Sequence, residues 1–487
     1  MKRFLAVLLC LAMIFSVTAC KPDNITYPSQ IKDPTEIGEE ETPAVDTPEQ
    51  PEETAPEKPD REEETQIKDA DTPAEEPKEE AEEAPLANPL AAEDFTPGTG
   101  TASALEISGM IKPGEAISAL KNRTIEIYTA DSQPAFSYQD KKGGTVTEWQ
   151  WMEHLAEENG FLLKYSVKNR NVSVKAQRVA LYAGKKLSLL QMTAEQLGDG
   201  LTLAASAADL LNTDVPSFGI SKTILEQSDY KLFAPVGNAE TLWYDPALMP
   251  KEADPEALTT TKKWTVEQFK TICDNAQGVQ RLKMGDLLPW ATLSGRSPLT
   301  LLDGKLDSNI NAGATRAVWS VLKAWDLNAL RAPLSESQEQ PATALFTYTD
   351  TPSIAEGMTL KYAPLPALEE GAAGTVTYAG TFFALPKYEK DSETRRAALN
   401  FAELWCNRYT EARAGVLQTL GLRGAAYQQY CHMVEAQGKL ILRSPEIENA
   451  AEDYLSGLTD PKVDMVAAYE KVRSKIDGLI AARNLYY

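Results

Sequence analysis

The sequence predicts an α/β fold with two lobes, on three observations. From about residue 100 to the C-terminus, short apolar strands alternate with amphipathic helices, which is typical of sheets built mainly from parallel strands. This region of about 390 residues exceeds the length at which a single hydrophobic core keeps growing, so two lobes are expected. The sequence contains no repeat of fixed period.

Individual elements follow from the spacing of apolar residues. Alternation of β-branched residues indicates a strand, and apolar positions on neighbouring turns indicate a helix. Gly160 is expected to end the first helix, and Thr265 to cap the second one. The pattern predicts strands over 124–128 and 161–167 and helices over 148–159, 264–275 and 314–330.

The N-terminus predicts export and lipidation. Met1-Lys2-Arg3 is a positive segment, and residues 4–17 form an apolar run that is too short to span a bilayer comfortably. The run leads into Val17-Thr18-Ala19-Cys20, which resembles the bacterial lipobox. We therefore expect residues 1–19 to be a signal peptide and Cys20 to be lipidated. The alternative is an ordinary secretory signal followed by a chance cysteine.

An acidic segment follows Cys20. Residues 21–94 contain 25 Asp and Glu against 6 Lys and Arg, a net charge of −19 out of −23 for the chain. With many prolines and almost no aromatic residues, residues 20–100 are expected to form a disordered tether. The rest of the chain is then near neutral and has no basic stripe, which argues against nucleic-acid binding.

Few residues suit catalysis or metal binding. The chain has two histidines, His154 and His432, without the cysteine or acid spacing of a zinc site. It contains neither a Gly-x-Ser-x-Gly motif nor a P-loop. Three cysteines remain after residue 20, namely Cys273, Cys406 and Cys431, and we expect buried thiols rather than a disulfide framework. The sequence therefore predicts neither a cofactor nor a metal, and no enzyme.

Several motifs resemble the extracellular solute-binding proteins of ABC importers, the family that binds sugars and oligosaccharides. The most specific one is Lys-Trp-Thr-Val-Glu-Gln-Phe at 263–269, similar to the family's Thr-Trp-x-Glu-Phe helix start. The Pro-Asp pair that is common in the family is absent from 183–190. Further similarities are the strand 124–128 with the loop 129–138, the crossing segments 233–236 and 242–246, the return segment 362–366, the Gly-containing strand 378–386 and the helix 397–406.

This resemblance implies a type II periplasmic-binding-protein-like fold, with a hinge of two or three crossings near 233–238 and 362–368. A ligand in the cleft would favour the closed state if residues of both lobes bind it. The resemblance divides the chain into a first lobe at 101–235 and 366–425, a second lobe at 236–365, and C-terminal helices at 426–487 that pack on the second lobe.

The expected cleft loops contain aromatic and planar polar residues that suit a sugar, because aromatic faces stack on sugar rings and polar groups replace water on the hydroxyls. For any single aromatic residue, packing in the core is the competing interpretation, and for the acids it is a turn or a helix cap. The candidates are Asp131, Ser132, Gln133, Asn238, Glu240, Trp243, Trp290, Arg296, Tyr348, Asp350, Tyr378, Thr381 and Phe382.

The sequence thus predicts a monomeric solute-binding lipoprotein on the extracellular face of the membrane. Its expected partners are a small solute, with sugar as the first choice, an ABC permease, and the membrane through the N-terminal lipid. One alternative is an extracellular glycan hydrolase with a carboxylate pair, which would show as two acids facing each other across a pocket. Another is a sensor or structural lipoprotein of the same fold, which would show as a shallow or apolar-filled cleft.

Overall fold

The computed structural model describes residues 110–112, 121–122, 124–129, 133–140, 142–168, 173–215, 219–250, 253–276, 279–285, 287–302, 305–325, 330–331, 344–352 and 359–485. All of them belong to the unit that spans residues 81–487. The predicted signal peptide, Cys20 and the predicted tether lie outside the described residues. Within the described residues, no helix combines the length and the apolar character needed to cross a bilayer.

The strands of the first lobe form two groups. β1 (Thr124–Thr129) pairs in parallel with β4 (Leu162–Val167). β14 (Thr381–Pro386) pairs antiparallel with both β5 (Leu190–Thr193) and β6 (Ala204–Ala205). The first lobe therefore recruits a strand from late in the chain. A short hairpin of β2 (Ser137–Gln139) and β3 (Thr145–Thr147) leads into the first long helix.

Five helices accompany these strands, and local capping explains where they begin and end. The side chain of Thr147 accepts a hydrogen bond from the Gln150 backbone and the Gln150 side chain caps Thr147 in return, while Gly160 ends the helix in a left-handed conformation (φ 68°). The helices are α2 (Glu148–Asn159), α3 (Ser173–Tyr182), α4 (Leu197–Gly200), α5 (Lys222–Gln227) and α10 (Ser392–Thr419).

The second lobe is organised around β7 (Ala239–Tyr244). This strand pairs antiparallel with β11, β12 and β13, whereas β8 and β15 join the sheet through parallel pairs. The prediction of mainly parallel sheets is therefore wrong for this lobe, because strands that return across the lobe insert beside β7 in the opposite direction. It is also wrong for the described strands of the first lobe, where β1 and β4 are parallel but β14 is antiparallel to β5 and β6. The partners are β8 (Leu282–Lys283), β11 (Phe346–Thr349), β12 (Lys361–Ala363), β13 (Val376–Tyr378) and β15 (Gly438–Lys439).

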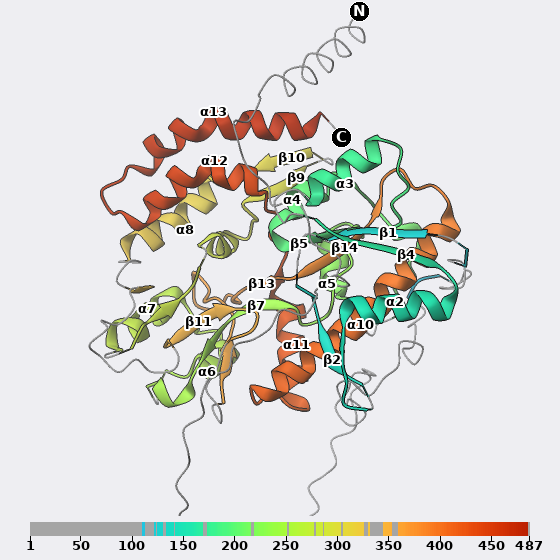
Figure 1. Ribbon diagram of the computed structural model, residues 1–487. Helices are drawn as coiled ribbons and strands as arrows, with labels where there is room; N and C mark the ends of the chain where they lie inside the picture. The colour runs from blue at the N-terminus through green and yellow to red at the C-terminus, as the bar shows by residue number, and fades with distance from the viewer. Residues whose placement is uncertain are drawn as a thin grey trace, which may run out of the picture. The chain divides into compact units, whose positions relative to one another are not determined.

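Helices and one hairpin complete the second lobe (Figure 1). Backbone groups of Leu306 in the hairpin exchange two hydrogen bonds of 2.8 Å with the side chain of Asn484, so the last helix lies against the hairpin. The helices are α6 (Pro255–Thr260), α7 (Val266–Asn275), α8 (Gly313–Ala324), α11 (Ala425–Gln437), α12 (Pro445–Ser456) and α13 (Met465–Asn484), and the hairpin is formed by β9 (Leu299–Leu302) and β10 (Lys305–Ser308).

The predicted elements can be compared with the observed ones. The strands at 124–128 and 161–167 and the helix at 148–159 are confirmed, and Thr265 caps α7 by accepting a hydrogen bond from the Gln268 backbone. The helix predicted over 314–330 is shorter, since α8 ends at Ala324 and Trp325 is already extended. Trp325 leaves the helical path and packs edge-on against Trp290 in the core.

The chain passes between the lobes more than once. It enters the second lobe through residues 236–238, directly before β7, and Ala379 and Gly380 separate β13, which pairs with β7, from β14, which pairs with β5. The segment 362–368, where the return crossing was predicted, begins in β12, which also pairs with β7. Gly380 has a left-handed backbone (φ 75°), and a Cβ atom there would lie 2.2 Å from Nδ2 of Asn238. Only glycine therefore fits at the point where the two crossings touch.

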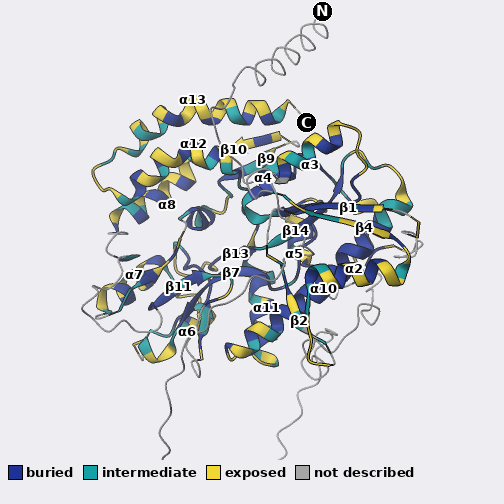
Figure 2. Ribbon diagram, viewed as in Figure 1, coloured by how far each residue is buried: buried dark blue, intermediate teal, exposed yellow. Residues whose placement is uncertain are grey.

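The buried apolar residues form two cores, which follow the division of the chain into lobes. One core is made of first-lobe residues of β1, α2 and α10, including Ile127, Trp151 and Trp405. A second and larger core joins the apolar side chains of the second lobe to one face of the first lobe, including Met192 of β5. The outward faces of α12 and α13 are exposed (Figure 2). The lobes are thus in apolar contact near the crossings.

Candidate functional site

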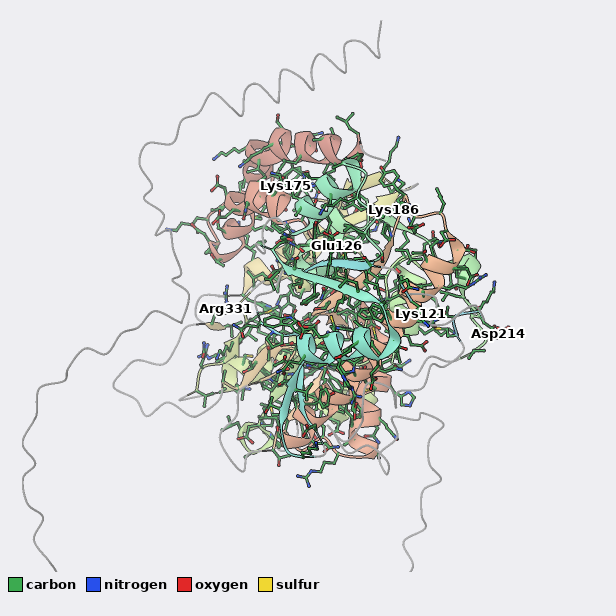
Figure 3. The ribbon with its side chains drawn as sticks, turned by 45° about the vertical axis from the view of Figure 1, so that its right-hand side comes forward. Lys121, Glu126, Lys175, Lys186, Asp214 and Arg331 are labelled. Carbon is green, nitrogen blue, oxygen red and sulfur yellow. The ribbon has the colours of Figure 1, made fainter. Side chains whose placement is uncertain are left out.

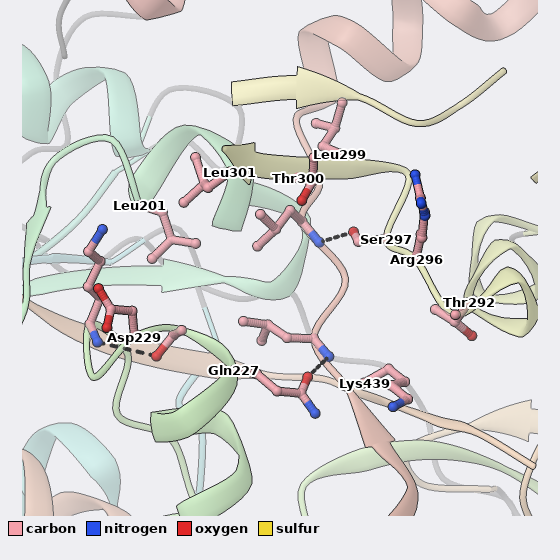
Figure 4. A pocket seen from close by; sticks show the side chains of 15 residues that line it. Leu201, Gln227, Asp229, Thr292, Arg296, Ser297, Leu299, Thr300, Leu301 and Lys439 are labelled. Atoms are coloured by element: carbon pink, nitrogen blue, oxygen red, sulfur yellow. Dashed lines mark hydrogen bonds between the residues drawn. The ribbon is translucent and has the colours of Figure 1, made fainter. Parts of the chain in front are cut away.

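A pocket of about 610 Å³ lies where three distant parts of the chain meet (Figure 4). The first lobe contributes Leu201 and residues of the segment 227–231, and the second lobe contributes residues of the segment 292–301. Residues of the segment 439–442, which follows α11, line it from between the two. The pocket is therefore lined by residues of both lobes and of the segment that follows α11.

The segment 438–442 is attached to both lobes. The side chain of Gln227 accepts a hydrogen bond from the Leu440 backbone (2.8 Å) and donates one to the carbonyl of Gly438 (2.7 Å). On the other side, the hydroxyl of Ser297 accepts from the Leu442 backbone (2.7 Å), and Leu299 forms an isolated β-bridge with Leu442. The segment therefore connects α5 to β9 along the pocket.

A tight turn after α5 places Asp229 at the pocket. Asp229 and Tyr230 both have left-handed backbones, with φ of 54° and 56°. The hydroxyl of Ser228 holds the turn, since it accepts hydrogen bonds from the backbones of Lys231 (3.2 Å) and Leu232 (3.0 Å). Two successive residues other than glycine in this conformation cost free energy, and such strain is common at binding sites.

The pocket lining is polar and carries positive charge. Lys231, Arg296 and Lys439 are its cations, and Asp229 is the one acid among its described lining residues. In Figure 4, Arg296 and Lys439 lie on one side of the view and Asp229 on the other. Hydroxyl and amide groups occupy much of the remaining lining, among them Gln227 and Thr300.

Arg296 is the one residue predicted from the sequence that lines this pocket. Asp131 and Ser132 lie outside the described residues, and Gln133 is exposed. Asn238 is buried at the crossing, and Glu240, Asp350 and Thr381 are half-buried. The five aromatic candidates are all buried, with Trp243, Trp290 and Phe382 at 1% exposure or less, and Tyr348 and Tyr378 at 7% and 3%.

The buried aromatic residues make internal contacts. The indole N–H of Trp243 donates to the carbonyl of Thr349 (3.0 Å), and that of Trp290 contacts the sulfur of Met284 (3.0 Å). The hydroxyl of Tyr348 lies 2.5 Å from the hydroxyl of Thr377, which donates in turn to Glu240 (3.2 Å). In this structure Trp243, Trp290, Tyr348 and Tyr378 are packed within the second lobe and Phe382 within the first, and none of the five lines the pocket.

Asn238 belongs to a hydrogen-bonded network at the crossing. Its amide donates to the carbonyl of Ala379 (2.8 Å), so it ties the outward crossing to the return one. Its side-chain oxygen accepts from the hydroxyl of Tyr409 in α10 (3.2 Å). Also from α10, Arg413 donates to the carbonyls of Gly237 (3.2 Å) and Asp350 (2.8 Å). This arrangement suits a hinge that is held by α10.

A smaller pocket of about 280 Å³ has mostly apolar walls and lies beside α5 and α11. One of its lining residues, Glu435, accepts a hydrogen bond from the backbone of Thr223 (3.2 Å). Burial raises the pKa of the Glu435 carboxyl, and its hydrogen bonds oppose the shift only partly. One of its oxygens is buried without a hydrogen-bond partner among the described residues.

The described residues contain no cluster of three or more side chains that could hold a metal ion. His154 is paired with Glu158 on the surface of α2 (3.1 Å). The sequence did not single out Gln227, Asp229, Lys231, Ser297 or Lys439 for the larger pocket. Sequence reasoning missed these residues because the pocket forms from segments that are distant in the chain.

Comparisons with known proteins define the fold. No family model matches the sequence, and no curated protein matches it. The structure is similar to the sugar-binding protein MalE from Xanthomonas citri, with 12% identity over 74% of this chain and 98% of that chain and a TM-score of 0.50. The predicted α/β, two-lobed periplasmic-binding-protein-like fold is thereby confirmed. So is the predicted resemblance to sugar-binding ABC solute-binding proteins, at the level of the fold.

Other solved structures show weaker likeness over the same extent. The cyclic alpha-maltosyl-1,6-maltose binding protein from Arthrobacter globiformis has 11% identity over 74% of this chain and 99% of that chain, with a TM-score of 0.48. An ABC transporter solute binding protein from Agrobacterium radiobacter K84, in complex with ribitol, has 15% identity over 74% and 99%, with a TM-score of 0.46.

Proposed function

We propose that this chain is a lipid-anchored extracellular protein that captures a carbohydrate and delivers it to an ABC importer. The observation that carries the proposal is the pocket of about 610 Å³, which is lined by both lobes of a fold similar to that of a sugar-binding MalE protein. The chain would act by binding and releasing its ligand, without a covalent step.

The lining suits a hydroxyl-rich ligand. A sugar loses water from each hydroxyl when it enters a pocket, and each of those hydroxyls needs a new hydrogen-bond partner. Ser297 and Thr300 of the second lobe supply hydroxyl groups, and the Gln227 amide of the first lobe keeps a second N–H and a second lone pair beyond its bonds to Gly438 and Leu440. The leucines of the lining, such as Leu299 and Leu442, can cover the apolar faces of a sugar ring.

Recognition would be coupled to the position of the lobes. A ligand shifts a conformational equilibrium only if it binds one state better than the other. Because the lining residues come from both lobes and from the segment 439–442, a ligand that contacts all three binds best when the lobes are close together. The closed, loaded form would be the one that the permease receives.

The predicted cleft residues outside the pocket stay part of this proposal. Asn238 and Glu240 would act at the hinge, and Asp131, Ser132 and Gln133, which follow β1 in the sequence, would contact the ligand. The aromatic candidates would reach a ligand only if opening of the lobes exposed them. The predicted permease, the lipid anchor and the monomeric state complete the proposal.

A binding panel tests the function. The full chain is mixed with monosaccharides, oligosaccharides, amino acids, peptides and polyamines, and the melting temperature is measured. A ligand at about 100 times its Kd should add roughly 2.7 kcal/mol of stability, or several degrees. Recovery of the intact sugar afterwards supports capture. Recovery of cleaved sugar would favour the hydrolase alternative, and the absence of any shift with sugars would contradict the proposal.

The anchor needs a separate test, because a secreted protein could bind sugar without one. Bacteria that express the chain are grown with radiolabelled palmitate. The label should enter the wild-type protein and be absent from the Cys20→Ser variant, which should appear in the medium. Labelling that is the same in both would contradict lipidation at Cys20.

A further inference from the structure

The charge of the pocket of about 610 Å³ indicates which class of solute it can bind. Three cationic side chains line it against one carboxylate. Lys231 belongs to the first lobe, Arg296 to the loop before β9 in the second lobe, and Lys439 to β15 beside the crossing. Cations from three separate segments are therefore placed around one space.

No ion pair joins Lys231, Arg296 or Lys439 to another described residue. Arg296 and Lys439 are exposed and Lys231 is half-buried, so all three side chains are accessible to a ligand in the pocket. Arg296 follows Gly295, whose left-handed backbone (φ 76°) ends the preceding helical turn. The hydroxyl of Ser294 accepts a hydrogen bond from the Arg296 backbone (3.3 Å), which fixes the loop, and the Arg296 side chain is exposed.

The lining also lacks the groups that favour a neutral sugar. None of its described residues is aromatic, so no ring face is present for stacking. Recognition must then come from hydrogen bonds and charge. A guanidinium binds carboxylate, sulfate or phosphate through two parallel hydrogen bonds, and such charge-assisted bonds are stronger than neutral ones.

The positive charge of the pocket is a local feature. Of the chain's net charge of −23, −19 lies in residues 21–94, and the rest of the chain carries about −4. An excess of cations in the pocket therefore does not follow from the composition of this part of the chain. Because salt screens charges beyond about 10 Å at 0.1 M, an anion inside the pocket would interact mainly with the three nearby cations.

We propose that the solute is an acidic saccharide, a sugar that bears a carboxylate, sulfate or phosphate group. This inference rests on the proposed function and names the class of its ligand. The anionic group binds Arg296 and Lys439, and the hydroxyls extend toward Gln227 and Asp229. Because Arg296 lies in the second lobe and Gln227 and Asp229 in the first, one ligand contacts both lobes.

Calorimetric titration of the full chain with matched ligands tests this. Galacturonate and galactose differ at one carbon, where one has a carboxylate and the other a hydroxymethyl group, and short oligomers of each extend the comparison. Glucose 6-phosphate and a sulfated sugar are the arms that distinguish the three anions. We expect an acidic member to bind at least tenfold more tightly than its neutral counterpart, and more weakly at high salt.

Single-residue variants test which cations of the pocket bind the acidic group of the sugar. Arg296→Gln and Lys439→Gln should each weaken binding of the acidic sugar by roughly 10- to 100-fold and leave the melting temperature unchanged. Lys475→Gln, an exposed lysine of α13 away from the pocket, is the control with the same loss of charge and should bind normally. Equal binding of neutral and acidic sugars, or normal binding by both pocket variants, would overturn the inference while the proposed function stands. Failure of every sugar to bind would instead contradict the proposed function.

Discussion

Arg483, near the end of α13, is paired with Asp199 of α4 and so joins the last helix of the chain to the first lobe. Arg483 is 6% exposed and also contacts Glu446 (3.0 Å). The hydroxyl of Ser444 donates to both oxygens of the Asp199 carboxylate (3.0 and 3.1 Å). Lys175 of α3, labelled in Figure 3, lines the same small gap between α3, α4 and the C-terminal helices.

We predict that this pair holds the lobes together. Arg483→Ala leaves the Asp199 carboxylate half-buried without its cation, which should cost roughly 1.5–3 kcal/mol of unfolding free energy. Small-angle scattering should also show a larger radius of gyration without ligand, because the contact crosses from one lobe to the other. The double variant Asp199→Ala/Arg483→Ala should lose less stability than the two single losses added together. A strictly additive double variant with unchanged scattering would argue against the contact.

A second prediction separates the core from the binding site. Trp290 is fully buried against Phe269 and Trp325, so Trp290→Ala should lower the unfolding free energy by about 3–5 kcal/mol. Denaturant titration measures this loss, and affinity at a temperature where the variant is still folded should be unchanged. Trp290→Phe, which keeps a ring in the core, should be milder. A selective loss of affinity with normal stability would instead place Trp290 at the ligand, as the sequence suggested.

The fold could be predicted because its signals are local. The capping box of Thr147 and Gln150, the terminal Gly160 and the cap at Thr265 are all readable within one turn of a helix. The direction of the strands was not readable in this way. Whether β14 runs parallel or antiparallel to β5 depends on which way the chain crosses from the other lobe, and no residue within β14 encodes that.

The candidate site was harder to predict for two reasons. Aromatic residues that suit a sugar-binding site also suit a hydrophobic core. Trp243 and Tyr348 would show the same alternation of apolar residues along a strand whether they faced a ligand or the core. The residues that line the pocket are common polar types. They form a site only because the fold brings distant segments together. Lys439 lies more than 200 residues from Lys231 in the chain and lines the same pocket.

A third prediction concerns pH. Burial raises the pKa of the Glu435 carboxyl above its usual 4.5, so the folded chain holds this proton more tightly than the unfolded chain does. Its contribution to stability is therefore fully present below pH 4.5 and is lost as the pH rises through the raised pKa. Glu435→Gln, which can still accept from the Thr223 backbone, should melt at a higher temperature than wild type at neutral pH.

At pH 4 the same Glu435→Gln variant and the wild type should melt together, because the wild-type carboxyl is then mostly protonated. Glu452→Gln, an exposed site in α12, is the matched control and should follow wild type throughout. A parallel offset between Glu435→Gln and wild type at every pH would show that the carboxyl is not the cause.

A fourth prediction concerns the thiols. Cys273, Cys406 and Cys431 are free and buried, and burial raises the pKa of Cys273 and of Cys431 to about 12. Because the thiolate is the reactive form, these residues should react slowly with a disulfide reagent at pH 8. In a chain with Cys10→Ser and Cys20→Ser, three thiols should titrate rapidly after unfolding in guanidinium. Rapid native labelling of any of the three would indicate local opening around that residue.

The pairing of β14 with β5 has a consequence for how the chain folds as it is made. Thr381 lies opposite Thr193, so the two strands are separated by about 190 residues. Until the ribosome has released β14, β5 has an open edge that could pair with the wrong strand. Most of the second lobe is synthesised in that interval and can form its β7 pairs first. The N-terminal lobe should therefore be the later one to mature, and its slow, long-range pairing should set the overall rate of folding.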